Sequence, residues 1–150
     1  MTNNNKEKLN HFFASCFNYI LRAEERALES ISNGKLTLKE IHFIEAVFKA
    51  MAVGENCLST LARMLRVTMG TAATSFKKLE QKGYLYKEQD QQDKRIYYII
   101  PTKLAELVNR EHTAFHEEVI DDIVKHLNGA ELDALTGALE KMAEYFDDYN

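Results

Sequence analysis

The sequence predicts an α/β fold that is mainly α-helical, with one short two-stranded β-ribbon set between helices. Apolar residues recur at helical spacing over most of the 150 residues. The chain contains one proline and six glycines, a composition that favours long helices. Between residues 84 and 100 the pattern changes, and aromatic and β-branched residues indicate a hairpin.

The first predicted helix covers Lys6–Ser32 and ends at Asn33-Gly34, because glycine adopts the left-handed conformation of a helix cap. The second helix opens at Thr37. A threonine followed three residues later by a glutamate, here Glu40, is the pattern of a capping box. Apolar spacing carries this second helix through Phe48.

Two shorter helices follow. The first is expected over Leu58–Leu65, and a tight connection at Arg66-Val67 separates it from the second. Thr68 caps the second helix, which runs to about Lys82, and Gly83 ends it.

Two strands are expected at Tyr84–Gln89 and Arg95–Ile100, joined by the polar residues 90–93. Two short helices, a tight turn and a two-stranded ribbon are the layout of a winged helix-turn-helix. In that layout the second helix of the pair lies in the major groove of DNA.

Two further helices complete the chain. Pro101-Thr102 closes the second strand and starts the first of them, which runs to about Leu127, and the second covers Ala130–Tyr149. We expect one chain-long unit, 1–150, in which residues 36–101 form the DNA-binding part and residues 1–35 and 102–150 form a helical dimerisation part. The terminal helices carry more apolar surface than a monomer of this size needs, although the same residues could close an internal core: Phe12, Phe13, Phe17, Leu135, Leu139 and Phe146.

Charge is distributed unevenly. The net charge of −4 argues against a nucleic-acid partner, but Leu58–Lys103 contains nine basic and four acidic residues, a local net charge of +5. A basic middle between acidic ends suits a protein that places one face on phosphate, while a solvated basic helix face is the alternative.

Three further features bear on location. No apolar run reaches the ~18 residues that cross a bilayer, and Met1–Lys8 does not start a signal peptide. Cys16 and Cys57 form no CxxC pair, which favours a reduced, cytoplasmic setting. We therefore expect no membrane association.

The helix after Thr68 has two faces. Ala72, Phe76 and Leu79 are predicted to face the core, so small polar and basic residues lie on the other side, where bases and phosphates would approach. An ordinary amphipathic helix with a polar solvent side is the alternative. The residues expected to contact DNA are Ser59, Thr68, Gly70, Thr71, Thr74, Ser75, Lys77, Lys78, Lys94 and Arg95.

Two stretches resemble the MarR-type regulators. Residues 67–85 are similar to the family's recognition helix running into the wing, and Asp93-Lys94-Arg95 ahead of Thr102 resembles its wing signature. The resemblance covers essentially the whole chain. It implies a symmetric homodimer that binds palindromic double-stranded DNA as a transcription repressor. It also implies that Arg95 reaches the minor groove, held by an ion pair with Asp93; the alternative is a capped turn with a solvated arginine.

Within that family the chain looks closest to repressors of fatty-acid synthesis, on the residues Lys39-Glu40-Ile41-His42, Lys82-Gly83-Tyr84 and Phe115-His116. A long-chain acyl group is the effector that this likeness implies. Its expected cleft is lined by Phe13, Phe17, Phe43, Val47 and Phe115, although apolar residues at helical spacing are more often plain core.

The alternative effector is Zn²⁺, which is also the one cofactor considered. His112 and His116 are four residues apart and so share one helical face. Resemblance brings the helix of His42 near them, and Glu24 adds a carboxylate. Three histidines and one carboxylate suit Zn²⁺, and the set resembles that of zinc-responsive members of the family. The other interpretation is that the histidines are ordinary pocket or solvent residues.

Catalysis is not expected. The sequence contains no GxGxxG, no GxSxG and no phosphate loop ending in Gly-Lys-Ser/Thr. The stretch His112–His116 lacks the glutamate that serves as general base in HExxH proteases. Two binding classes remain as alternatives: an interaction protein without DNA binding, and an RNA-binding winged helix.

Overall fold

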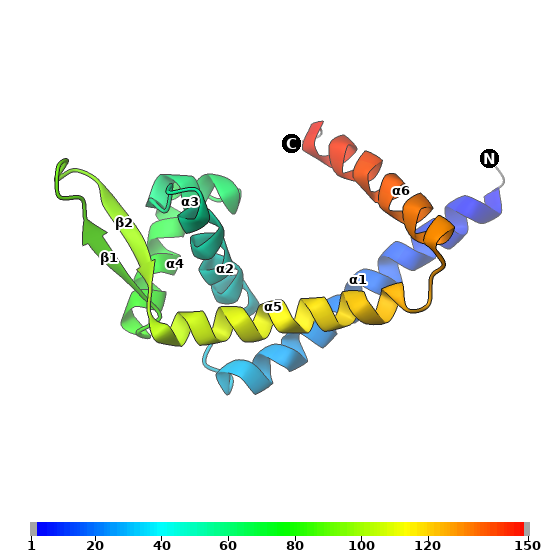
Figure 1. Ribbon diagram of the computed structural model, residues 1–150, viewed down its shortest axis with the longest axis horizontal. Helices are drawn as coiled ribbons and strands as arrows, with labels where there is room; N and C mark the ends of the chain where they lie inside the picture. The colour runs from blue at the N-terminus through cyan, green and yellow to red at the C-terminus, as the bar shows by residue number, and fades with distance from the viewer. Residues whose placement is uncertain (1–2, 149–150) are drawn as a thin grey trace. The chain divides into compact units, whose positions relative to one another are not determined.

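The computed structural model describes residues 3–148, and within them the chain is mainly helical with one antiparallel β-hairpin, as predicted (Figure 1). Tyr149, the expected end of the last helix, lies outside the described residues. The elements are α1 (Asn3–Ser32), α2 (Leu38–Ala52), α3 (Leu58–Met64), α4 (Met69–Gln81), β1 (Leu85–Gln89), β2 (Tyr97–Pro101), α5 (Lys103–Val124) and α6 (Gly129–Asp148).

The capping box predicted at the start of α2 is confirmed. The backbone N–H of Glu40 donates to Thr37 Oγ1 at 3.3 Å, and the backbone N–H of Thr37 donates to Glu40 Oε2 at 2.8 Å. Before it, α1 ends at Asn33 and Gly34, whose φ angles of 49° and 70° turn the chain into the next helix. The end of α1 and the start of α2 are therefore both determined by residues close to them in sequence.

The strands are shorter than expected. β1 begins at Leu85 because the backbone N–H of Tyr84 still bonds to Leu79 O of the preceding helix at 2.9 Å. β2 begins at Tyr97, two residues later than expected, because two carboxylates hold the turn. Asp90 Oδ1 accepts from the backbone N–H of Asp93 at 2.7 Å, which closes the hairpin before pairing starts.

The long helix α5 also differs at both ends. Pro101 is the last residue of β2, and Thr102 precedes the helix, its hydroxyl accepting from the backbone N–H of Ala105 at 3.4 Å. At the other end, Leu127 N bonds to Val124 O, three residues back. That tightened turn ends the α-helix before Leu127.

The chain divides into two compact units, residues 1–112 and 113–150. The first unit contains α1 to α4, the hairpin and the start of α5, around one hydrophobic core. Leu28 and Val108 lie in the same core as α2 to α4, which places the end of α1 and the start of α5 in this unit. The functional division at residues 36–101 stays a prediction.

The hairpin is joined to the helices at its base. Leu85 and Ile99 are buried, and the loop before α3 contacts β2 through Asn56. Asn56 Nδ2 donates to Ile99 O at 2.9 Å, and Ile99 N donates to Asn56 O at 2.8 Å. Cys57 and Tyr98 form an isolated antiparallel bridge beside these bonds. Across residues 3–148, no helix combines the length and apolar character that crossing a membrane requires.

Candidate functional site

Helix α4 presents a polar face to solvent. Its apolar residues Ala72, Phe76 and Leu79 are buried in the core, as predicted. Thr68 caps the helix, with the backbone N–H of Thr71 donating to Thr68 Oγ1 at 3.1 Å. The residues on the opposite side are exposed, except for half-buried Ser75: Thr68, Gly70, Thr71, Thr74, Lys77 and Lys78.

Three hydroxyl groups of that face are already oriented by hydrogen bonds. Thr68 Oγ1 and Thr71 Oγ1 lie 2.9 Å apart and share a hydrogen bond. Thr74 donates its hydroxyl proton to Gly70 O at 2.9 Å. Because that proton is used inside the helix, Thr74 offers its oxygen lone pairs and its methyl group to a ligand.

The wing holds Arg95 in one orientation. Its Nε donates to Asp93 Oδ1 at 3.1 Å and its Nη2 donates to Asp93 Oδ2 at 3.0 Å, a two-point ion pair. The hydrogen bonds from Arg95 lower the pKa of Asp93, and the same contact raises the pKa of Arg95. The Arg95 side chain is 90% exposed, so the cation faces solvent. Lys94 is also exposed and donates from Nζ to Asp90 O at 3.2 Å.

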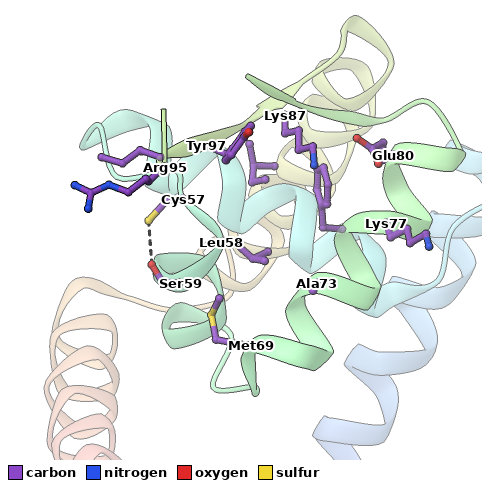
Figure 2. A pocket seen from close by; sticks show the side chains of 13 residues that line it. Cys57, Leu58, Ser59, Met69, Ala73, Lys77, Glu80, Lys87, Arg95 and Tyr97 are labelled. Carbon is purple, nitrogen blue, oxygen red and sulfur yellow. Dashed lines mark hydrogen bonds between the residues drawn. The ribbon is translucent and has the colours of Figure 1, made fainter. Parts of the chain in front are cut away.

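An open groove of about 740 Å³ lies between α3, α4 and the wing (Figure 2). Ser59 lies at its edge, with its hydroxyl 3.1 Å from Cys57 Sγ. Hydrogen bonds with Ser59 and then Thr60 lower the pKa of Cys57 to about 7. Lys77 of α4 and Arg95 of the wing line the same groove, so it joins the two sets of expected DNA contacts.

A second cluster joins α1, α2 and α5 inside the first unit. Glu24 Oε1 lies 3.3 Å from His42 Nε2 and 3.1 Å from His112 Nε2. Glu24 and His112 are buried, whereas the His42 side chain is 43% exposed. One ligand atom from each residue lies within 4.8 Å of the others. The structure thus brings together three of the four predicted metal ligands. The fourth, His116, belongs to the second unit.

The residues of the expected acyl cleft do not share one environment. Phe43 and Val47 are 2% and 0% exposed and pack inside the hydrophobic core, so a ligand could reach them only if the core opened. Phe13 stacks on the exposed ring of Phe17, with centroids 5.7 Å apart, on α1. Phe115 lies in the second unit beside His116. The cleft as a whole stays a prediction, and the expectation that Phe43 and Val47 line open space is corrected.

Comparisons with known proteins agree with this geometry. Residues 54–97, from the loop before α3 to the start of β2, match the MarR family. The uncharacterized HTH-type transcriptional regulator YybA of Bacillus subtilis (strain 168) is 34% identical over 88 residues, which cover 55% of this chain and 57% of that relative's length.

Solved structures extend the likeness to the whole chain. Streptococcus pneumoniae FabT in complex with DNA superposes with a TM-score of 0.85 and 27% identity, covering 97% of this chain and 99% of that one. The chain therefore has the winged helix-turn-helix fold seen in MarR-type structures. A Staphylococcus aureus MepR–DNA complex shares this fold, with a TM-score of 0.68, 21% identity and coverage of 89% and 97%. YybA is described as a transcriptional regulator, and the FabT and MepR structures contain DNA, which agrees with the expectation that this chain is not an enzyme.

Sequence reasoning missed three features of the structure. Lys87 and Tyr97 meet in the groove, where the Lys87 ammonium lies 5.3 Å from the centre of the Tyr97 ring. Lys82 binds both oxygens of Glu40, at 2.7 and 2.8 Å. The perturbed thiol of Cys57 is the third. Alternation along the hairpin could have indicated the first pair, whereas the partners of Lys82 and Cys57 become visible only in three dimensions.

Proposed function

We propose that this MarR-type protein is a sequence-specific DNA-binding transcription regulator that acts as a repressor. The observation that carries the proposal is the joint presentation of the polar face of α4 and of Arg95, held outward by Asp93. In a winged helix-turn-helix the helix reads the major groove, while a wing beside it reaches the adjacent backbone and minor groove. The 27% identity to FabT, whose structure contains DNA, supports the same use of this surface.

We further propose a homodimer that binds a palindromic operator. Each unit exposes large apolar residues that a monomer would leave in water. In the first unit α1 exposes Phe12 and Phe17, at 56% and 59%, and in the second unit α6 exposes Leu139 and Phe146, at 49% and 53%. Two-fold related recognition helices read half-sites about one helical turn apart.

The test is a selection from random duplex DNA, followed by binding measurements over a range of salt concentrations. A palindromic site should emerge, and log affinity should fall linearly with log salt by about 0.9 per phosphate contact. Recovery of no preferred duplex, or an affinity that ignores salt, would overturn the proposal. Sites captured next to promoters would then identify the regulated genes.

For the effector we propose a long-chain acyl group, consistent with the likeness to repressors of fatty-acid synthesis. A long-chain acyl-CoA or acyl-carrier protein should shift operator affinity by roughly 5- to 150-fold, the range of coupling free energies common in allostery. The response should survive treatment with a metal chelator.

A second candidate function is favoured by one observation, the cluster of Glu24, His42 and His112. In a tetrahedral zinc site with bonds of about 2 Å, neighbouring ligand atoms are about 3.3 Å apart. The two distances from Glu24 Oε1, 3.1 and 3.3 Å, match that edge. Zinc would occupy the positions of the Nε2 protons, leaving each imidazole protonated on Nδ1. The residues therefore suit a zinc-responsive regulator.

Operator affinity separates the two candidates. A zinc-responsive protein should respond to micromolar Zn²⁺, lose the response on chelation, and lose it in His42→Ala and His112→Ala. His11→Ala, which removes an exposed histidine of α1 outside the cluster, is the matched control and should respond like the parent. An unchanged response in His112→Ala would exclude the cluster as a metal sensor. Stoichiometric zinc in the purified protein would favour it over the acyl effector.

A further inference from the structure

The hairpin turns one of its faces toward α4. Leu85, Lys87 and Gln89 alternate along β1 and therefore point to the same side. Lys87 is paired with Ile99, and Gln89 with Tyr97, so these β2 residues lie on that side too. Near the base of the hairpin this face buries Leu85 and Ile99 against the helices. The same face also carries Lys87 and Tyr97, and both side chains line the groove.

Lys87 is held in that position by an aromatic ring. It is a diagonal neighbour of Tyr97 across the hairpin, a separation that long side chains bridge. Its ammonium lies 5.3 Å from the ring centre, within the range of a cation–π interaction. Tyr97 is fixed in turn, because Gln89 Nε2 donates to its hydroxyl oxygen at 2.9 Å. Figure 2 shows Lys87 beside Tyr97 at the groove.

The charges around the groove suit a polyanion. Lys77 from α4, Lys87 from β1 and Arg95 from the wing line it, against one carboxylate, Glu80. Apolar side chains of the lining, such as Met69 and Ile96, offer contact to sugar rings. Phosphate contacts from lysine and arginine position a protein on a duplex without reading its sequence.

We propose that Lys87 is a further DNA-contacting residue, and that the groove seats the sugar-phosphate strand that passes between the helix in the major groove and the wing in the minor groove. This inference rests on the proposed DNA-binding function. Lys87 binds a phosphate from the wing side of the groove, and Lys77 lines the α4 side of the same groove. Tyr97 is a positioning residue, because its ring fixes the ammonium that makes the contact.

The first test compares Lys87→Gln with the parent on a selected operator and on an unrelated duplex. In a dimer the substitution removes one phosphate contact from each protomer, so the slope of log affinity against log salt should decrease by about 1.8, and both duplexes should be weakened by the same factor. Lys141→Gln, which removes an exposed lysine of α6 with the same change in charge, should leave the slope unchanged. A Lys87→Gln protein with the parent's slope and affinity would overturn the inference.

The second test addresses Tyr97. Tyr97→Leu should weaken binding in the direction of Lys87→Gln, because the ring that holds the ammonium is lost. Tyr97→Phe keeps the ring and should retain the parent's affinity. In the Lys87→Gln background, Tyr97→Leu should have no additional effect; an additive loss would contradict the positioning role. If the parent itself bound no duplex, the proposed function would fail. If the parent bound DNA and Lys87→Gln bound it equally well, only this inference would be refuted.

Discussion

At the scale of single residues, exposure and restraint are combined in Arg95. Its guanidinium is 90% exposed yet bonded at two points to Asp93, so its direction is set before any ligand arrives. An exposed ion pair of this kind adds little to stability. The ion pair instead favours binding, because an arginine that is already oriented loses less side-chain entropy when it contacts a ligand.

Arg95→Ala should weaken binding to all duplexes and leave the melting temperature close to that of the parent. Asp93→Asn keeps the Arg95 cation but removes the carboxylate that orients it. Its DNA affinity should fall between those of the parent and of Arg95→Ala. Competition binding with operator and unrelated DNA, alongside a thermal melt, measures both effects. Unchanged affinity in Arg95→Ala at moderate salt would show that Arg95 makes no contact with DNA.

Thr74 lies on the face of α4 that is expected to read bases. Thr74→Ala should change which sequences bind best, by about 1–3 kcal/mol at the contacted base pair, when the random-duplex selection is repeated. Thr136→Ala is the matched control, since Thr136 makes the same hydroxyl bond to the carbonyl four residues back, at 3.0 Å on α6. Identical selected sequences from the Thr74→Ala protein would remove this residue from the reading surface.

Cys57 should titrate near neutral pH. Hydrogen bonds with Ser59 and Thr60 stabilise its thiolate and lower the pKa to about 7. The thiolate is the reactive form, so the rate of alkylation by iodoacetamide should rise with pH and reach half its plateau near that value. Ser59→Ala should move the midpoint upward. Mass spectrometry distinguishes Cys57 from Cys16, and a midpoint unaffected by Ser59→Ala would refute the assigned cause.

At the scale of elements, one carboxylate links the start of α2 to the end of α4. Glu40 closes the capping box and also accepts two hydrogen bonds from Lys82, which in addition donates to Lys35 O at 2.9 Å. Burial raises the pKa of Glu40, but the bonds from Lys82 and Thr37 outweigh it, so the net pKa is lowered. The orientation of α4 therefore depends on a contact between elements.

Lys82→Gln should destabilise the fold by about 1–3 kcal/mol, because it leaves the buried Glu40 carboxylate without its charged partner. Since the folded pKa of Glu40 is depressed, its contribution is present above the unfolded pKa and is lost as pH falls through the folded pKa. Urea unfolding at several pH values measures this. Lys125→Gln, which breaks the exposed pair with Asp122, is the control and should change stability little.

These two contacts of Glu40 mark the limit of what the sequence could show. The capping box was predictable because its partners are three residues apart. Lys82 is 42 residues away from Glu40, and no local sequence pattern predicts that the two side chains meet. The same distinction applies to the strands: alternation placed them, but the side-chain bonds of Asp90 and Asp93 decided where pairing begins. Glu24, His42 and His112 could be grouped only through resemblance to a family, because their spacing spans 88 residues.

At the scale of the whole molecule, exposed apolar helix faces predict self-association. Leu135→Lys combined with Leu139→Lys on α6 should weaken the dimer and, with it, operator affinity, because two half-sites are then read by separate chains. Sedimentation velocity at several concentrations measures the first effect. Asp133→Asn, on the other side of the same helix, changes charge in the same direction and should have no effect. A parent that sediments as a monomer at all concentrations would exclude the dimer.

The short contact between Asn56 and Ile99 has a consequence for aggregation. A two-stranded hairpin normally offers two open edges to strands of other molecules. Along β2, one edge is partly covered by the paired bonds of Asn56 and by the bridge from Cys57. The other edge, β1, carries the charged residues Lys87 and Glu88, which discourage edge-to-edge pairing. The wing can therefore stay exposed for a ligand without recruiting the wing of a second copy.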